Sequence, residues 1–149
     1  MPATATIPQV PRSIYRPVLV QLGTAMALVG LDSRTIEAMA EAGELRWVFD
    51  VSSEDQNGTR HVRAMRFWVG ELLNQSGARF KSVDQVIDAV IGTQDPLLGT
   101  YRVQNTLAVD YCTLLRLMAS GALPTVREGR NWRVLRVGLD QFLRQRLQQ

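Results

Sequence analysis

An internal repeat is the feature that most restricts how this chain of 149 residues can fold. When Gly121 is aligned with Gly43, the segment LAVDYCTLLRLMASGALPTV lies over VGLDSRTIEAMAEAGELRWV. Few residues are identical, but helix caps, apolar positions and glycines return in the same order. The matched positions are Asp32 with Asp110, Thr35 with Thr113, Ile36 with Leu114, Met39 with Leu117, Leu45 with Leu123, and Val48 with Val126. We therefore predict two divergent copies of one small unit.

The alignment continues beyond a predicted hairpin, after the offset between the copies changes by eight residues. The segment NWRVLRVGLDQFL then lies over HVRAMRFWVGELL. One change of offset inside a predicted loop is expected of divergent copies, because loops absorb insertions at a small free-energy cost. The matched positions in this part are Arg63 with Arg133, Arg66 with Arg136, and Leu73 with Leu143.

Each copy carries the same order of local signals. In the first copy, the apolar segment VLVQLGTAMALVG is predicted to be a helix, and Asp32 or Ser33 caps a second helix that ends at Gly43. Two strand patterns follow, LRWVFDV and RHVRAM, with Asn57 and Gly58 in the loop between them, before the short amphipathic helix RFWVGELLN. This order is typical of a helix-turn-helix followed by a β-hairpin wing.

The predicted fold class is therefore mainly α with small β-hairpin wings, arranged as two tandem winged helix-turn-helix units. We place the first unit at residues 18–74 and the second at residues 100–149. Residues 1–17 hold four of the six prolines and are predicted to form a flexible arm. Residues 75–99 contain the capped helix SVDQVIDAVI and form either a connector or an extra helix of the second unit.

The second copy resembles the MerR-like winged-helix domains of the excisionase type over residues 107–143. LAVD corresponds to the turn of that family, the segment from Thr113 to Leu117 to its recognition helix, and SGALP to the exit from this helix. REGRNWRV corresponds to the wing, and the segment from Leu139 to Leu143 to the closing helix. The first copy fits more loosely, because its wing loop is longer and GELRW replaces the proline exit.

The resemblance implies sequence-specific binding to double-stranded DNA. Proteins of this family act as recombination directionality factors of mobile elements or as small transcription regulators, and a recombinase or another DNA-bound protein is then a further partner. A homodimer or a cooperative assembly on DNA is compatible with this role. The competing interpretation is a protein-interaction adaptor, in which the winged helices bind a protein partner instead of DNA.

Arginine supplies almost all of the positive charge, since Lys81 is the single lysine among 17 basic residues. The guanidinium group of arginine can donate two parallel hydrogen bonds to a phosphate or to the edge of a guanine, so this bias is compatible with nucleic-acid binding. A GC-rich genome would produce the same bias. For Arg133 the alternative to a phosphate contact is a structural ion pair, formed if the strand alternation turns its side chain inward, and for Thr113 the alternative is packing against the preceding helix. The predicted DNA-binding residues are Arg34, Arg60, Arg63, Tyr111, Thr113, Arg116, Arg127, Arg130 and Arg133.

The two predicted recognition helices differ in charge. The second carries no acidic residue after its cap, Asp110, whereas the first carries Glu37 and Glu41, with Glu44 just beyond. DNA phosphates repel carboxylates, so we hypothesise that the second copy is the principal DNA-binding unit. The first copy would then contact DNA through the base of its wing or bind a protein. In the alternative, its acidic residues face away from DNA and both copies dock alike.

The sequence does not favour an enzyme. It has no phosphate-binding GxxxxGK loop and no plausible pairing of a serine or cysteine nucleophile with a histidine. His61 and Cys112 are the single histidine and the single cysteine, so no zinc site of four such ligands can form. We expect no catalytic residue, no metal and no cofactor. In the absence of an apolar run of about 18 residues or a signal-peptide pattern, we expect no membrane contact and a cytoplasmic, nucleoid-associated location.

Overall fold

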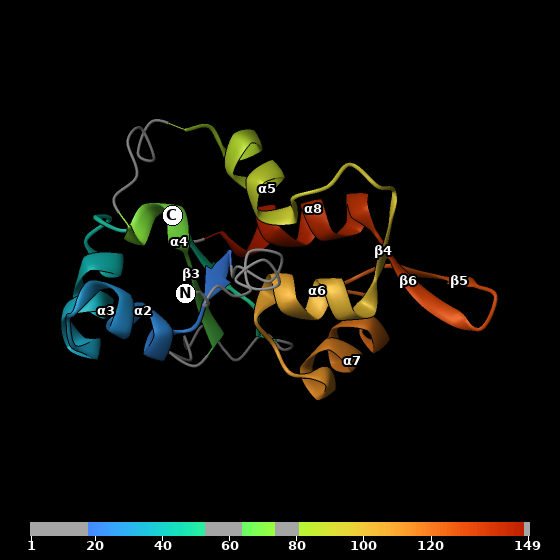
Figure 1. The fold of residues 1–149 in the computed structure, drawn as a ribbon, viewed down its shortest axis with the longest axis horizontal. Helices are drawn as coiled ribbons and strands as arrows, with labels where there is room; N and C mark the ends of the chain where they lie inside the picture. Colours follow the sequence, from blue (N-terminus) through green and yellow to red (C-terminus); the bar gives the residue numbers. More distant parts are fainter. Residues whose placement is uncertain (1–17, 53–63, 74–80, 148–149) are drawn as a thin grey trace, which may run out of the picture.

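The computed structural model describes residues 18–52, 64–73 and 81–147. Over these ranges the chain forms seven helices and two antiparallel sheets of three strands each, a mixed and mostly helical fold (Figure 1). The predicted mainly helical class with small antiparallel strands is confirmed at this level. The elements are, in chain order, β1 (Leu19–Val20), α2 (Leu22–Val29), α3 (Ser33–Glu41), β2 (Val48–Asp50), β3 (Met65–Trp68), α4 (Val69–Leu72), α5 (Val83–Ile91), β4 (Leu97–Gly99), α6 (Thr100–Leu107), α7 (Tyr111–Ala119), β5 (Thr125–Glu128), β6 (Asn131–Leu135) and α8 (Arg136–Arg146).

The first element differs from the sequence prediction. VLVQLGTAMALVG was expected to be one helix, but Leu19 and Val20 form the strand β1, and α2 begins only at Leu22. Leu19 pairs with Trp68, and Val20 pairs with Phe67, both in β3. The helical pattern failed here because these pairings join residues far apart in the sequence, and such contacts override local preference.

From β1 to α4 in the first half, residues 18–73, and from β4 to α8 in the second half, residues 81–147, the described helices and strands follow in the same order, and α5 of the second half is additional. The strand order is β1-β3-β2 in the first sheet and β4-β6-β5 in the second, so the returning strand of each hairpin lies at the centre. Helices α2 and α6 have 8 residues each, and α3 and α7 have 9 each. The helical part of the predicted repeat is therefore matched element by element.

Helices α3 and α7 begin and end alike. Asp32 and Asp110 accept hydrogen bonds from the backbone N–H groups of Thr35 and Thr113, at 2.8 and 2.7 Å. Such caps satisfy N–H groups that have no partner within the helix. The glycine after each helix takes a φ of 81° or 82°, in the left-handed region that glycine enters at little cost. The predicted caps and helix ends are confirmed.

Beyond the hairpin, the sequence alignment of the two copies is wrong by three residues. The pairing of β1 and β4 with the returning strands aligns Arg66 with Arg133 rather than with Arg136. The error arises because arginines recur at every third position in both copies, so that a shift of three residues keeps them matched. The pairing of β2 with β3 and of β5 with β6 aligns Val48 with Thr125, so the predicted match of Val48 with Val126 is wrong by one residue.

The first sheet is buried on both faces, and this joins the two halves. Alternate side chains of a strand point to opposite faces of its sheet. Val20 and Phe67 pack with α2, α3 and α4 in one core. Leu19, Phe49 and Trp68 belong to a second, larger core that includes α5, α6, α7 and α8. The first sheet therefore supports both halves.

Residues 83–99 belong structurally to the second half. Helix α5 buries four apolar side chains in the core that also holds α8, and the two helices lie side by side (Figure 1). Strand β4 pairs with β6. Arg136, at the start of α8, donates from Nε to the carbonyl of Thr93 at 2.7 Å and from Nη2 to the Asp88 carboxylate at 3.0 Å. The helix SVDQVIDAVI is thus the extra helix that the sequence allowed.

Candidate nucleic-acid interface

Helices α6 and α7 are joined by a tight turn in the second half. Helix α6 ends at Ala108, which has φ 54° and ψ 46° and is the one non-glycine residue with positive φ in the described ranges. Leu107 and Val109 on either side of it are buried, as are Leu114 and Leu117 on α7. One face of α7 is therefore fixed against the core, and the opposite face is left to solvent.

The N-terminus of α7 is fixed by its cap. The hydroxyl and the backbone N–H of Thr113 both hydrogen bond to Asp110 and lower the pKa of its carboxyl below the usual value. The charges of Arg116 and Arg66 act in the same direction more weakly. Asp110 is therefore ionised at neutral pH, with its charge directed at N–H groups of its own helix. The hydroxyl and the backbone N–H of Thr113, a predicted DNA contact, are thus both bonded to Asp110.

The solvent side of α7 carries two predicted DNA-binding residues. Tyr111 is 56% exposed and lies in the first turn of the helix, from which base and phosphate contacts usually come. Arg116 is exposed one turn further on. The other exposed side chains of this half of the helix are Cys112 and Leu115. No acidic residue follows the cap, so the exposed face of α7 is neutral to basic.

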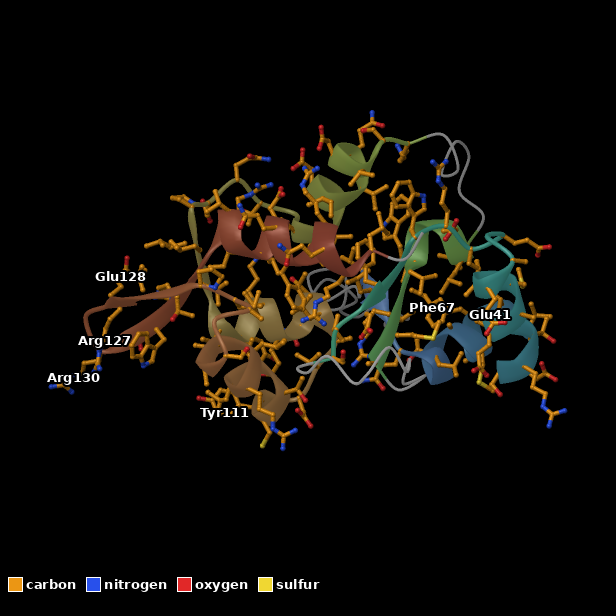
Figure 2. The ribbon with its side chains drawn as sticks, turned by 180° about the vertical axis from the view of Figure 1, so that it is seen from behind. Glu41, Phe67, Tyr111, Arg127, Glu128 and Arg130 are labelled. Atoms are coloured by element: carbon orange, nitrogen blue, oxygen red, sulfur yellow. The ribbon has the colours of Figure 1, made fainter. Side chains whose placement is uncertain are left out.

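The β5–β6 hairpin projects beyond the core, at the opposite end of the molecule from α3 (Figure 1). Its strands are joined by Gly129, with a φ of 64°, and Arg130. The Arg127 guanidinium lies over the ring of Trp132, 5.4 Å from the ring centroid, and its Nε donates to the Gly129 carbonyl at 3.3 Å. Arg130 forms no hydrogen bond or ion pair with any residue that the structure describes. The hairpin tip thus carries two exposed guanidinium groups (Figure 2).

Arg133 lies nearer the base of the hairpin and forms the ion pair that the sequence left as an alternative. Its Nε is 3.2 Å from a carboxylate oxygen of Glu128, and both side chains are partly exposed. The guanidinium also lies close to Gly99, where an added Cβ would be 3.1 Å from Nη1. Exposed ion pairs contribute little to stability, so a phosphate can replace Glu128 as the partner at small cost.

The first half presents a different surface. Helix α3 exposes Arg34 together with Glu41, and Glu44 is exposed just after it. Glu41 lies at the end of the molecule opposite the hairpin tip (Figure 2). The predicted residues Arg60 and Arg63 lie outside the described residues. The second half carries the predicted residues Tyr111, Thr113 and Arg116 on α7 and Arg127, Arg130 and Arg133 on the β5–β6 hairpin.

Sequence reasoning missed a contact that holds the turn between α6 and α7. Arg66 is 5% exposed, and its Nε donates to the carbonyls of Leu107 and Ala108 at 2.9 and 3.1 Å. Gln21 Nε2 donates to the same Ala108 carbonyl at 3.0 Å. Burial lowers the pKa of Arg66, and the charges of Asp110 and Asp50 oppose this shift. The sequence of the first copy held no signal for this contact, because the burial of Arg66 depends on the second half covering the first sheet.

Comparison of the chain with protein-family models, with curated proteins and with solved structures gave no match. Over the residues that the structure describes, no group of three or more histidine, cysteine, aspartate or glutamate side chains could hold a metal ion. No helix within the same ranges is long and apolar enough to cross a membrane.

Proposed function

We propose that this protein binds double-stranded DNA through a winged helix-turn-helix unit in its second half, with α7 as the recognition helix and the β5–β6 hairpin as the wing. The observation that carries this proposal is the pair of exposed guanidinium groups, Arg127 and Arg130, on a hairpin that projects beyond the core. The hairpin follows α7 in the chain, and the exposed face of this helix carries Arg116 and no carboxylate beyond the cap.

The dimensions of α7 support this proposal. An α-helix with its side chains is about 10–12 Å in diameter, and the major groove of B-DNA, about 12 Å wide, admits it. Once α7 lies in the groove, the adjacent wing approaches the phosphate backbone. Arg127 and Arg130 then displace condensed cations from the phosphates, which favours binding and makes it sensitive to salt. Tyr111 and Arg116 are the side chains in position to contact bases.

We propose that the first half positions the DNA-binding unit of the second half and does not bind DNA in the same way. Arg66 and Gln21 hold the carbonyls at the end of α6, and the shared core joins the first sheet to the second half. The orientation of α7 therefore depends on residues of the first half. The exposed Glu41 and Glu44 argue against a close approach of α3 to phosphates.

The biological role is proposed from the resemblance at residues 107–143. It favours an accessory factor of a mobile element, acting in recombination, or a small transcription regulator in the cytoplasm. An adaptor function is the second candidate, and the acidic end of the first half favours it. Glu37, Glu41 and Glu44 form a surface complementary to a basic protein such as a DNA-bound recombinase.

A salt titration tests the proposal. Binding to a random-sequence duplex of about three helical turns is followed by fluorescence anisotropy, since each helical turn offers about ten base pairs. The wild-type affinity should fall steeply with salt. In the Arg127→Ala/Arg130→Ala variant the slope of log K against log[salt] should be shallower by about 1.8, or about 0.9 for each lost phosphate contact.

The matched control is Lys81→Ala/Arg144→Ala, which removes the same net charge at exposed positions outside α7 and the β5–β6 hairpin. Its slope should equal that of the wild type within error. Absence of wild-type binding at low salt would overturn the proposal in favour of the adaptor. An equal loss of slope in both double variants would show diffuse charge attraction and overturn the assignment of the wing.

A further inference from the structure

The exposed face of α7 is unusually apolar for a surface helix. Tyr111 is 56% exposed and Leu115 is 43% exposed. These residues are four positions apart, so their side chains are neighbours on one stripe along the helix. Cys112 is exposed beside them. Trp132, on the adjoining hairpin, is 48% exposed. The folding unit does not require this stripe, because the first half has Ser33 and Glu37 at the positions of Tyr111 and Leu115.

Arginines lie on α7 itself and on the hairpin that follows it in the chain. Arg116 follows Leu115 on the same helix, and Arg127 and Arg130 extend along the hairpin. The single carboxylate of the α7 N-terminus, Asp110, is occupied by hydrogen bonds from Thr113. A ligand for this surface must therefore combine negative charge at its borders with apolar groups between them.

The major groove of DNA has this combination. Phosphates line both of its edges, and the C5-methyl group of thymine is the apolar group that bases present on its floor. Resting on the proposed DNA-binding function, we infer that α7 recognises thymine methyl groups, with Leu115 and the ring of Tyr111 as the contacting groups. Arg116 supplies a polar contact next to them. The protein therefore prefers sites that carry thymines in the segment of groove occupied by the first two turns of α7.

Replacing thymine by uracil tests this inference. The substitution removes the methyl group and keeps base pairing and every hydrogen-bonding group of the groove edge. The probes are two alternating duplexes of equal length, one of A·T and one of A·U pairs, at equal salt. Each buried methyl contact should make the A·T duplex bind about fourfold more tightly, the equivalent of about 0.8 kcal/mol. Replacing cytosine by 5-methylcytosine in an alternating G·C duplex adds a methyl at the same ring position and should strengthen binding.

Variants assign the effect to the stripe. In Leu115→Ala the ratio of affinities for the A·T and A·U duplexes should fall toward one. Leu28→Ala is the matched control, because Leu28 is also an exposed leucine on a helix, 42% exposed, but lies in the first half. Its affinity ratio should stay at the wild-type value. Arg130→Ala should weaken binding to both duplexes equally and leave the ratio unchanged. Circular dichroism of each variant verifies that it is folded.

The outcomes separate this inference from the proposed function. If the wild type binds both duplexes equally, methyl recognition is overturned while DNA binding stands. If the Leu115→Ala ratio equals that of the control, Leu115 does not contact the methyl group and the assignment fails. If no duplex is bound at low salt, the proposed function itself fails, and the apolar stripe is then a surface for a protein partner.

Discussion

Helices α3 and α7 occupy the same place in the two halves, and they differ almost only on their exposed sides. Ile36 and Leu114 are both fully buried, and each helix is capped by an aspartate bonded to a threonine three residues on. The positions that are not buried have diverged: Ser33, Arg34, Glu37, Ala38 and Glu41 on α3 correspond to Tyr111, Cys112, Leu115, Arg116 and Ala119 on α7. The buried and capping residues of the two helices therefore match, while the residues on their solvent side do not.

The two sheets differ in a related way. The outer face of the first sheet is covered by the second half, so its central strand buries even Arg66. At the same position in the second sheet, Arg133 is partly exposed, and the hairpin continues beyond the core. The same small sheet is therefore a buried support in the first half, whereas in the second half it extends into a projecting hairpin.

Replacing Arg66 and Arg133, which occupy equivalent positions in the two sheets, should give the largest difference in stability between the two halves. Arg66→Ala leaves the carbonyls at the end of α6 without their buried donor, so the free energy of unfolding should fall by about 3 kcal/mol. Arg133→Ala removes one exposed ion pair and should lower it by less than about 0.5 kcal/mol. Urea unfolding followed by circular dichroism measures both values. Equal losses would mean that the junction between the halves does not depend on Arg66.

The sequence carries enough information for the local features and too little for the non-local ones. The caps at Asp32 and Asp110 and the glycines that end α3 and α7 were predictable, because each depends on a few neighbouring residues. The strand β1 was not, because two residues become a strand only by pairing with β3. The register beyond the hairpin was hidden by arginines at every third position.

The candidate site divides in the same manner. Arginines at a hairpin tip are visible in REGRNW, because a short turn with glycine exposes its neighbours. The buried role of Arg66 depends on which half covers the first sheet, and no pattern within one copy contains that fact. Exposure of Tyr111 and Leu115 follows only once the inward face of α7 is fixed by Leu114 and Leu117.

Exchanging the exposed residues of the two helices should sharpen the comparison. Leu115→Glu/Ala119→Glu gives α7 the two carboxylates of α3 and should weaken DNA binding at least tenfold, about 1.4 kcal/mol, through repulsion by phosphates. The reciprocal variant, Glu37→Leu/Glu41→Ala, should change affinity by less than about twofold, or about 0.4 kcal/mol. Anisotropy titrations at one salt concentration measure both. A large gain in affinity from the reciprocal variant would show that α3 also approaches DNA.

Replacing the glycine after α3 and the glycine after α7 should lower the free energy of unfolding by the same amount in both halves. Gly43→Ala and Gly121→Ala place a side chain at φ values of 81° and 82° with no atom within 4 Å of the added Cβ. Only backbone strain is introduced, so each variant should lose about 1 kcal/mol of stability. Thermal unfolding midpoints that fall by the same amount would support the equivalence, and a clear difference between them would contradict it.

The two caps should differ slightly in their response to acid. The pKa of each carboxyl lies below its usual value, chiefly because the threonine three residues on donates to it, and Asp110 also has Arg116 and Arg66 nearby. A depressed pKa in the folded state stabilises the protein above the unfolded pKa, and this contribution disappears as the pH falls below about 4. Asparagine is about as good a helix cap as aspartate, but its side chain does not titrate in this range. Asp110→Asn should therefore reduce the acid-dependent loss of stability more than Asp32→Asn does, as measured by urea unfolding between neutral pH and about pH 3. A larger reduction for Asp32→Asn would mean that the charges of Arg116 and Arg66 do not add to the stabilisation of the Asp110 carboxylate.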